Sequence, residues 1–399
     1  MLEEEKRQTF LLLHVDRYNS FIVPELQGLL NNTKEEYTIY ATKIEGPIKY
    51  TVITTSFSTI DYILSKSMLV SRAIKILNFT EYGKADKKAE EPSSIVDKLS
   101  SSLTADVLEF LKKEVKGDYK IECICNDKIQ AIEHLVTSLG MQQNVNLSNP
   151  AHSIYVVEES CFCIVGVLYK ESNRKQLLKY SVKNRQFIGN TSMDNEISFI
   201  ICNASGVSDK TVLLDCYAGS GSILLSGAIH GSLVVGTDIN SKQFKGRDIP
   251  HTNSRIKTQL PNTSIHSNFK MYNVADKVLM IGAQNVFDGC IFRDSTVDVI
   301  LCDPPYGERE TVKKRATDSN KYVEGCDQYL LFSIPFLDRA IEMGKKVLKN
   351  RGRIGIFLPH ATGHTPQLKE MEGVRKVSQS EQFLNALYSR TFFLLEIIK

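Results

Sequence analysis

The chain has 399 residues, which is enough for two or three domains that each have their own core. Its composition, with 42% hydrophobic and 24% charged residues, is ordinary for a globular protein and excludes disorder on a large scale. The net charge of +3 permits a nucleic-acid partner without indicating one, and no apolar run approaches the roughly 20 residues that span a bilayer.

Two features of the sequence indicate where the protein acts. At the amino terminus, three acids precede a short apolar run, which is the reverse of a secretory signal. The nine cysteines are an odd number scattered along the chain, which is typical of free thiols in a reducing compartment. We therefore expect a cytoplasmic protein that has no membrane anchor.

Residues 1–170 mix helical and strand-like patterns, which predicts an α+β region. The helical segments read FIVPELQGLL and TIDYILSKSMLVSRAI, and the strand-like ones read YKIECIC, SIYVVEE and CFCIVGVLY. The polar stretch 83–101 predicts a surface loop that runs into a helix.

Two Cys-x-Cys pairs lie in this half of the chain, Cys123/Cys125 and Cys161/Cys163. Each pair would place both sulfurs on one face of a strand. Four such thiols could bind zinc, but the spacing differs from the usual Cys-x-x-Cys and no histidine is suitably near. The pattern favours packing in the core, and we predict no metal site.

Residues 171–190 are a predicted linker, and residues 191–399 form a second domain that alternates strands and helices. Its first unit is βαβ, since TVLLDCYAG and SLVVGTDIN are strand patterns and SGSILLSGAIHG between them has helical spacing. VLMIGA and VDVILC follow as candidate central strands of a parallel sheet, because both faces of each are apolar.

The remainder of the second domain completes the sheet. Residues 328–348 predict a long amphipathic helix that Pro335 kinks or divides. RGRIGIFLP supplies another strand, and FLNALYSRTFFLLEII could close the sheet with a hairpin. The fold predicted for this domain is α/β, with a doubly wound and mostly parallel sheet.

Small and acidic residues follow the first two strands of this domain. Asp215 ends the first strand, and Gly219 and Gly221 flank Ser220 where the helix begins, so that a ligand can approach the backbone closely. Asp238 ends the second strand at about the spacing from the glycines at which an acid binds a ribose diol.

The glycine loop differs from a dinucleotide-binding loop at one position. Leu224 stands where G-x-G-x-x-G has its third glycine. S-adenosylmethionine (SAM) enzymes use the same arrangement of strand, loop and acid, with the methionine end of SAM near the glycine loop. The pattern therefore favours SAM over NAD as the cofactor.

The turn DPPYG follows the strand VDVILC. Because prolines have no backbone donor, the Pro304 carbonyl can remain free to accept, while Asp303 adds a second acceptor and Tyr306 a flat ring. These groups fit the exocyclic amine of a stacked base, which they would hold in line for methyl transfer. Alone the motif indicates only a turn, but the glycine loop and acid that precede it favour an amine-methylating site.

The stretch that precedes the first strand has two interpretations. Thr191 and Asp194 fit a capping box that opens the helix DNEISFIICN. The simpler interpretation is a linker followed by a capped helix. The functional one is a lid in which Met193 contacts the methionine end of the cofactor.

Four blocks resemble the eukaryotic and archaeal tRNA guanosine-10 N2-methyltransferase family: YSVKNRQFIGNTSMDNEISFIICN, LDCYAGSGSILL, GTDIN and DVILCDPPYGERE. The amino half also resembles the family, in its ferredoxin-like and THUMP region, which binds tRNA. The similar segments are FLLLHVDRYNSFIVPELQGLL and SKSMLVSRAIKI. The resemblance implies a class I Rossmann-like methyltransferase that transfers a methyl group from SAM to N2 of a tRNA guanosine. It also implies a small zinc-binding activator subunit as a partner.

The family's site residues carry over to this chain one by one. The cofactor loop falls on Asp215, Tyr217, Gly219, Ser220 and Gly221, the ribose acid on Asp238 followed by Ile239, and the catalytic motif on Asp303, Pro304, Pro305 and Tyr306. There is one departure. Family members usually have an acid that binds the adenine amine after the strand VLMIGA, where this chain has Gln284 and Asn285, although an amide oxygen can still accept.

Two alternatives stay open. The DPPY motif also serves adenine, so methylation of another tRNA guanine or of adenine N6 in a nucleic acid is possible. A non-catalytic RNA-binding subunit is the other alternative, against which the acids at 215, 238 and 303 argue. The basic loop ERETVKKRATDSNKY is equally well explained by tRNA contact and by simple solvent exposure.

Overall fold

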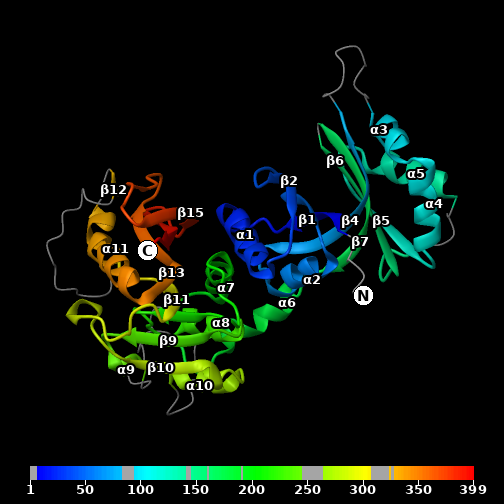
Figure 1. Ribbon diagram of the computed structural model, residues 1–399. Coiled ribbons are helices and arrows are strands. Elements are labelled where there is room, and N and C mark those ends of the chain that lie inside the picture. The colour runs from blue at the N-terminus through cyan, green and yellow to red at the C-terminus, as the bar shows by residue number, and fades with distance from the viewer. Residues whose placement is uncertain are drawn as a thin grey trace. The chain divides into compact units, whose positions relative to one another are not determined.

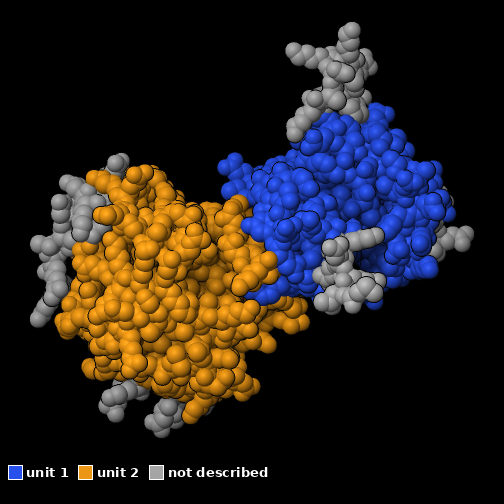
Figure 2. All heavy atoms as spheres, viewed as in Figure 1, with its two compact units in different colours: residues 1–15, 35–64, 70–172 blue, residues 16–34, 65–69, 173–399 orange. Residues whose placement is uncertain are grey.

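The computed structural model describes residues 7–82, 94–140, 145–159, 161–189, 192–244, 264–306, 323–324 and 328–399. It is a mixed α/β structure that contains two large sheets (Figure 1). The chain divides into two compact units (Figure 2), of which unit 1 comprises residues 1–15, 35–64 and 70–172 and unit 2 comprises residues 16–34, 65–69 and 173–399. In the part of the chain that is described, no helix has the length and apolar character needed to cross a membrane.

Unit 1 contains a sheet in which seven of the described strands pair in the order β2-β3-β1-β4-β7-β6-β5. The strands are β1 (Gln8–His14), β2 (Thr38–Lys43), β3 (Tyr50–Thr55), β4 (Val70–Glu81), β5 (Tyr119–Ile124), β6 (His152–Glu159) and β7 (Phe162–Glu171). All neighbours are antiparallel except β5 and β6. The long strand β4 pairs with β1 on one side and β7 on the other, so it joins the two halves of the sheet.

Three helices of unit 1 cover one end of this sheet: α3 (Ile95–Ser102), α4 (Ala105–Glu114) and α5 (Lys128–Leu139). Leu99, Leu111 and Leu135 of these helices pack with Ile154 and Val165 of the sheet in one buried cluster. The helix predicted at the end of the polar stretch 83–101 is therefore present as α3, whereas residues 83–93 lie outside the described part.

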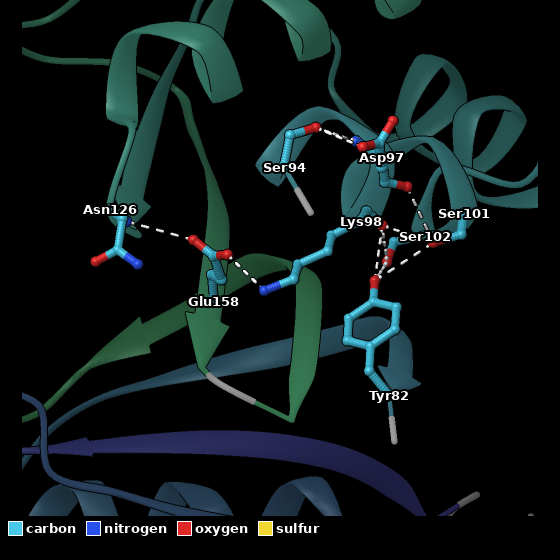
Figure 3. A network of polar contacts seen from close by, with 8 residues as sticks. All are labelled: Tyr82, Ser94, Asp97, Lys98, Ser101, Ser102, Asn126 and Glu158. Carbon is cyan, nitrogen blue, oxygen red and sulfur yellow. Dashed lines mark hydrogen bonds and ion pairs between the residues drawn. The ribbon is translucent and has the colours of Figure 1, made fainter. Parts of the chain in front are cut away.

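Hydrogen bonds hold α3 against the sheet (Figure 3). The Ser94 hydroxyl accepts from the Asp97 amide and so caps the helix, and the Tyr82 hydroxyl donates to the Lys98 carbonyl at 2.9 Å. Lys98 Nζ lies 2.8 Å from Glu158 Oε1, and both side chains are largely buried. Partly buried pairs of this kind are held more firmly than exposed ones, because solvent screens them less.

The cysteine pairs of unit 1 lie at the end of β5 and at the start of β7, two strands that β6 separates in the sheet. Cys123 and Cys163 are buried in the same apolar cluster, whereas Cys125 is half-buried and Cys161 exposed. Burial raises the pKa of the Cys123 thiol to about 12 and that of Cys163 to about 11. Neither thiol is a ready thiolate ligand at neutral pH.

The helix predicted over TIDYILSKSMLVSRAI is wrong in its second half. α2 (Phe57–Lys66) ends at Lys66, and β4 follows. The backbone N–H groups of Met68 and Leu69 donate to the carboxylate of Glu25, at 2.9 and 3.0 Å, instead of continuing the helical ladder. The carboxylate of Glu25, which is distant in sequence, has therefore replaced the backbone carbonyls that would accept these hydrogen bonds in a helix.

Glu25 joins three separate stretches of unit 2. It lies on α1 (Ile22–Thr33), is fully buried, and accepts from Ser67 Oγ at 2.6 Å and from Asn203 Nδ2 at 2.8 Å in addition to the two amides. Burial raises the pKa of Glu25, and the hydrogen bonds act in the opposite direction. This carboxylate explains why residues 16–34 and 65–69 belong to unit 2 although they are distant in sequence from its remainder.

Unit 2 has a sheet in which seven of the described strands pair in the order β10-β9-β8-β11-β13-β16-β15. The strands are β8 (Val212–Asp215), β9 (Leu233–Asp238), β10 (Val278–Ala283), β11 (Val297–Cys302), β13 (Leu348–Ala361), β15 (Val374–Phe383) and β16 (Tyr388–Ile397), with a separate ribbon of β12 (Val323–Glu324) and β14 (Gln367–Leu368). The first five strands in this order are parallel to one another, and β16 and β15 each pair antiparallel with the strand before them. The mostly parallel sheet predicted from the sequence is confirmed.

Besides α1, the described helices of unit 2 are α6 (Arg174–Leu177), α7 (Asn195–Ala204), α8 (Ser222–Ile229), α9 (Ser241–Phe244), α10 (Ile265–Met271) and α11 (Gln328–Val347). Leu214 of β8 packs in a buried cluster with Leu337 of α11. The preceding residue, Leu213, lies so close to α8 that a Cβ on Gly227 would be 2.4 Å from its Cδ2. Because successive residues of a strand point to opposite faces, α8 and α11 cover opposite faces, as in a doubly wound fold.

Three expectations for this sheet need correction. β10, predicted as a central strand, is an edge strand, and its Leu279 is 57% exposed. α11 is one continuous helix, so Pro335 does not divide it. The hairpin uses β15 and β16, so the segment FLNALYSRTFFLLEII supplies the turn and one strand, while the other strand lies upstream of it.

Candidate active site

Three acids lie at the carboxyl edge of the parallel sheet. Asp215 and Asp238 are the last residues of β8 and β9, and Asp303 directly follows β11. β11 pairs with β8 in parallel, and the Sγ atoms of Cys216 and Cys302, next to two of these acids, are 3.3 Å apart. The structure therefore brings these strand ends together, where doubly wound sheets bind their ligands.

The glycine loop follows β8 and leads into α8. Gly219 and Gly221 both have positive φ, +50° and +77°, a conformation that favours glycine. A Cβ on Gly221 would also lie 2.2 Å from Ile265 Cδ1, so no larger residue fits there. Asp238 Oδ2 accepts from the Gly219 amide at 2.8 Å, which ties the loop to the end of β9.

Two of the acids are held by backbone amides. Asp215 Oδ1 accepts from Tyr217 N at 3.0 Å, and Asp238 Oδ1 accepts from Asn240 N at 2.8 Å. Burial raises the pKa of Asp215 well above its ordinary value, and burial also raises that of Asp238. Asp215 is only 1% exposed, so it shapes the loop from inside, whereas Asp238 is half-buried.

Ile239, Gln284 and Asn285 lie beside Asp238. Ile239 is 73% exposed, an apolar side chain uncovered at the edge of the site. The Gln284 amide donates to the Asp238 carbonyl at 2.9 Å, and its side-chain Nε2 donates to the Gly289 carbonyl. Asn285 Oδ1 accepts from Phe287 N and so begins a short 3₁₀ turn. Neither amide reproduces the charge of an acid at this position.

The segment before α7 packs against the glycine loop. Ser192 Oγ donates to Ser220 Oγ at 2.8 Å, and half-buried Met193 is the next residue. The expected capping box is wrong, because the N-cap of α7 is Asp194, whose carboxylate accepts from Glu196 N at 2.8 Å. The carboxylate of Asp194 therefore caps the helix through its second amide, and Thr191 lies outside the described residues.

The DPPY turn is held by a residue that the sequence did not indicate. Arg390 Nη1 donates to Asp303 Oδ2 and to the Tyr306 hydroxyl, both at 2.7 Å, and the Tyr306 hydroxyl donates to Asp303 Oδ1. The Arg390 guanidinium also bonds Gln382 through Nε and lies 3.9 Å from the centre of the Phe357 ring. Pro304 is buried and Pro305 half-buried.

Burial and the neighbouring charges both shift the pKa values of the side chains in this turn. Burial raises the pKa of Tyr306 well above its ordinary value. Burial lowers the pKa of Arg390, but the neighbouring Asp303 and Tyr306 outweigh it and the net shift is upward. Arg390 comes from β16, and no local motif marks it, because only the pairing of β16 with β13 brings it to the site.

The residues present fit SAM. The positive-φ glycines leave no side chain over the start of α8, and a carboxylate that can bind a ribose diol ends the next strand. The buried hydroxyl of Tyr217 has no partner among the described residues, so a polar ligand group can still satisfy it. Residues 307–322, with the basic loop, lie outside the described part.

A doubly wound sheet with a glycine loop after the first strand, an acid after the second and a DPPY turn after a central strand defines a Rossmann-like methyltransferase domain. Residues 183–320 match the family model described as RMKL-like, methyltransferase domain. The resemblance stated from the sequence is confirmed by the curated relatives that the chain matches.

These relatives are named tRNA (guanine(10)-N(2))-methyltransferases. The chain is 25% identical to TRMT11 of Rattus norvegicus over 98% of this chain and 88% of that protein. It is 28% identical to TRMT11 of Homo sapiens over 74% of this chain and 62% of that protein. It is 26% identical to the Saccharomyces cerevisiae enzyme over 64% of each of the two chains. Among solved structures, TrmN from Thermus thermophilus matches with 14% identity and a TM-score of 0.47, covering 98% of this chain and 100% of that one.

Proposed function

We propose that the protein transfers a methyl group from SAM to the exocyclic N2 of a guanosine in tRNA, at position 10. The observation that carries the proposal is the convergence of the glycine loop, Asp238 and the DPPY turn at one edge of the sheet. The names of the relatives support guanosine and tRNA as the substrate. The cytoplasm is the compartment in which we expect this activity.

Each side chain has a role in this proposal. Asp238 would bind the ribose hydroxyls of SAM, and the glycine loop with Tyr217 would lie along its methionine part. Bound SAM supplies an electrophilic methyl group. Asp303 and the Pro304 carbonyl accept the N–H groups of the guanine amine, which localises the nitrogen lone pair, and the Tyr306 ring stacks on the base.

The contacts of Asp303 add a step to this mechanism. Both of its oxygens already accept hydrogen bonds, from Tyr306 and from Arg390. We propose that the guanine amine takes the place of the Tyr306 hydroxyl on Oδ1, which also releases the Tyr306 ring to stack. Arg390 stays bonded to Oδ2 and keeps the carboxylate in place during the exchange.

The amino half would recognise tRNA. We assign this role to residues 1–170, with residues 171–190 as the linker to the catalytic domain at 191–399. By its resemblance to the family, this region corresponds to a ferredoxin-like and THUMP module. A small zinc-binding activator subunit is the proposed protein partner.

Methylation of bulk tRNA in vitro, with labelled SAM and mapping of the labelled nucleotide, tests the proposal. We expect label in N2-methylguanosine at position 10. Label in another guanosine would support methylation of another tRNA guanine. Label in N6-methyladenosine would support methylation of adenine N6. If neither the chain alone nor the chain with its activator binds SAM, the non-catalytic alternative is correct.

A further inference from the structure

Arg185 is a buried cation beside the glycine loop. It follows a 3₁₀ turn at Val182–Asn184, and only 7% of its surface is exposed. Nη1 donates to Ser222 Oγ at 2.7 Å, and Ser222 is the first residue of α8. The Nε–H group is buried and has no hydrogen-bond partner within the described ranges.

No acid among the residues that the structure describes is hydrogen-bonded to this guanidinium, whose Nε–H group has no partner there. Tyr272 and Asp194 interact with the guanidinium electrostatically, without a hydrogen bond, and this interaction raises the pKa of Arg185. The carboxylate of Asp194 is exposed and occupied with the amide of Glu196. Within the described ranges, Arg185 is therefore a charge without a counter-ion.

Burial of such a charge is costly. Removing a cation from water requires an anion and hydrogen-bond acceptors in return, and one serine hydroxyl supplies only a small part of this. Burial lowers the pKa of Arg185 to about 10, so the group is still protonated at neutral pH. A protonated, buried and incompletely bonded arginine indicates that its anion arrives with a ligand.

The surroundings of Arg185 identify the end of the ligand that it meets. Ser222 begins α8 directly after Gly221, so the unpaired amides of the first turn lie near the same place and also favour an anion. The opposite side of the loop is tied to Asp238, which is suited to hydroxyl groups and not to an anion. The anion is therefore at the end of the ligand away from the ribose.

We propose that Arg185 binds the carboxylate of the amino-acid end of SAM. This inference rests on the proposed function, because it assigns the carboxylate of the cofactor to the buried guanidinium of Arg185 beside the loop. Ser222 holds the guanidinium in position through Nη1, and the Nε–H group donates to the incoming carboxylate. Arg185 is thus a cofactor-binding residue that selects the amino-acid end.

The test compares two ligands that differ only in this carboxylate, SAM and decarboxylated SAM, by calorimetry on the full chain without tRNA. The wild-type chain should bind SAM roughly 30-fold or more tightly than decarboxylated SAM, the lower end of what a buried charge pair contributes. In the Arg185→Met variant, the affinity for SAM should fall by a similar factor and that for decarboxylated SAM should stay nearly constant. Arg185→Lys should keep part of the preference, because it retains the charge but not the planar fork.

Stability separates this role from a structural one. Because no described residue supplies a counter-ion for this charge, the unfolding temperature of Arg185→Met without ligand should equal or exceed that of the wild type. The matched control is Arg353→Met, which removes a half-buried arginine near the start of β13, where it pairs with Val299 and not with the strand ends of the site. This control should keep the wild-type preference for SAM.

Three results would count against these assignments. If the ratio of the two affinities in folded Arg185→Met equals that of the wild type, another group binds the carboxylate and the inference is wrong. It is equally wrong if the wild type binds both ligands alike. If the wild type binds neither SAM nor decarboxylated SAM, alone or together with its activator, then the proposed function itself fails.

Discussion

The guanidinium of Arg390 is paired with the carboxylate of Asp303, with 2.7 Å between Nη1 and Oδ2. The same nitrogen bonds the Tyr306 hydroxyl, so one arginine holds both functional ends of the DPPY turn. The arginine is itself fixed by Gln382 and by the Phe357 ring. The geometry of the turn thus depends on a residue of the last strand.

Arg390→Met should lower kcat/KM for tRNA by roughly 100-fold, because a misplaced catalytic group loses most of its effect. The loss should be in kcat, with SAM affinity unchanged, and Arg390→Lys should recover part of it since the charge is kept. Steady-state kinetics and calorimetry measure both quantities. A change in KM alone would show that Arg390 serves tRNA binding instead of positioning Asp303.

Asp303→Ala should abolish methyl transfer and leave SAM binding intact, because the carboxylate is the acceptor for the amine and does not hold the glycine loop. Transfer of labelled methyl groups to tRNA and calorimetry with SAM are the two measurements. Full activity in this variant would disprove the role given to Asp303.

Asp238→Ala should weaken SAM binding by about 1.5–3 kcal/mol for each hydrogen bond that the carboxylate makes to the ribose. The variant also loses the bond to the Gly219 amide, so the loop should become less ordered. Calorimetry measures the affinity, and hydrogen exchange of the Gly219 amide reports on the loop. Unchanged affinity would place the ribose elsewhere.

Gly221→Ala should destabilise the methyltransferase domain by roughly 1–3 kcal/mol, because the new Cβ meets Ile265 and the backbone has φ +77°. Gly282→Ala is the matched control, since a Cβ on Gly282 would meet no atom within 4 Å. Chemical denaturation followed by circular dichroism gives both free energies of unfolding. Equal effects of the two substitutions would show that the close contact does not exist.

The buried thiols of unit 1 predict a loss of stability at alkaline pH. The pKa of Cys163 is about 11 in the folded chain and near 9.0 without burial, so the folded state retains a proton that the unfolded state releases. The stabilisation is complete below pH 9 and declines as the pH rises toward 11. Denaturant unfolding at pH 8 and pH 10 should show this decline, and Cys163→Ala should reduce it.

Alkylation provides an independent check on the same thiols. At pH 8, iodoacetamide should modify exposed Cys161 first and buried Cys123 and Cys163 last, because the thiolate is the reactive form. Mass spectrometry of peptides at successive times gives the order. Rapid modification of Cys163 in the folded protein would contradict its burial.

Much of unit 2 could be predicted from local sequence. The order of strand, glycine loop, helix and acid over residues 211–240 follows from spacing within a single βαβ unit, where neighbours in sequence are neighbours in space. The edge position of β10 could not be predicted in this way. Its apolar pattern resembles that of a central strand, and only the pairing of the sheet decides its place.

The sequence by itself determined the doubly wound sheet and the positions of Asp215, Asp238 and the DPPY turn along the chain. The tertiary structure decided which groups meet these residues: Arg390 from the last strand, Arg185 at the first turn of α8, and Glu25 across three separate stretches of unit 2. The reason is physical. Periodicity and turn chemistry act over a few residues, whereas buried charges take their partners from wherever the packed chain brings opposite or hydrogen-bonding groups.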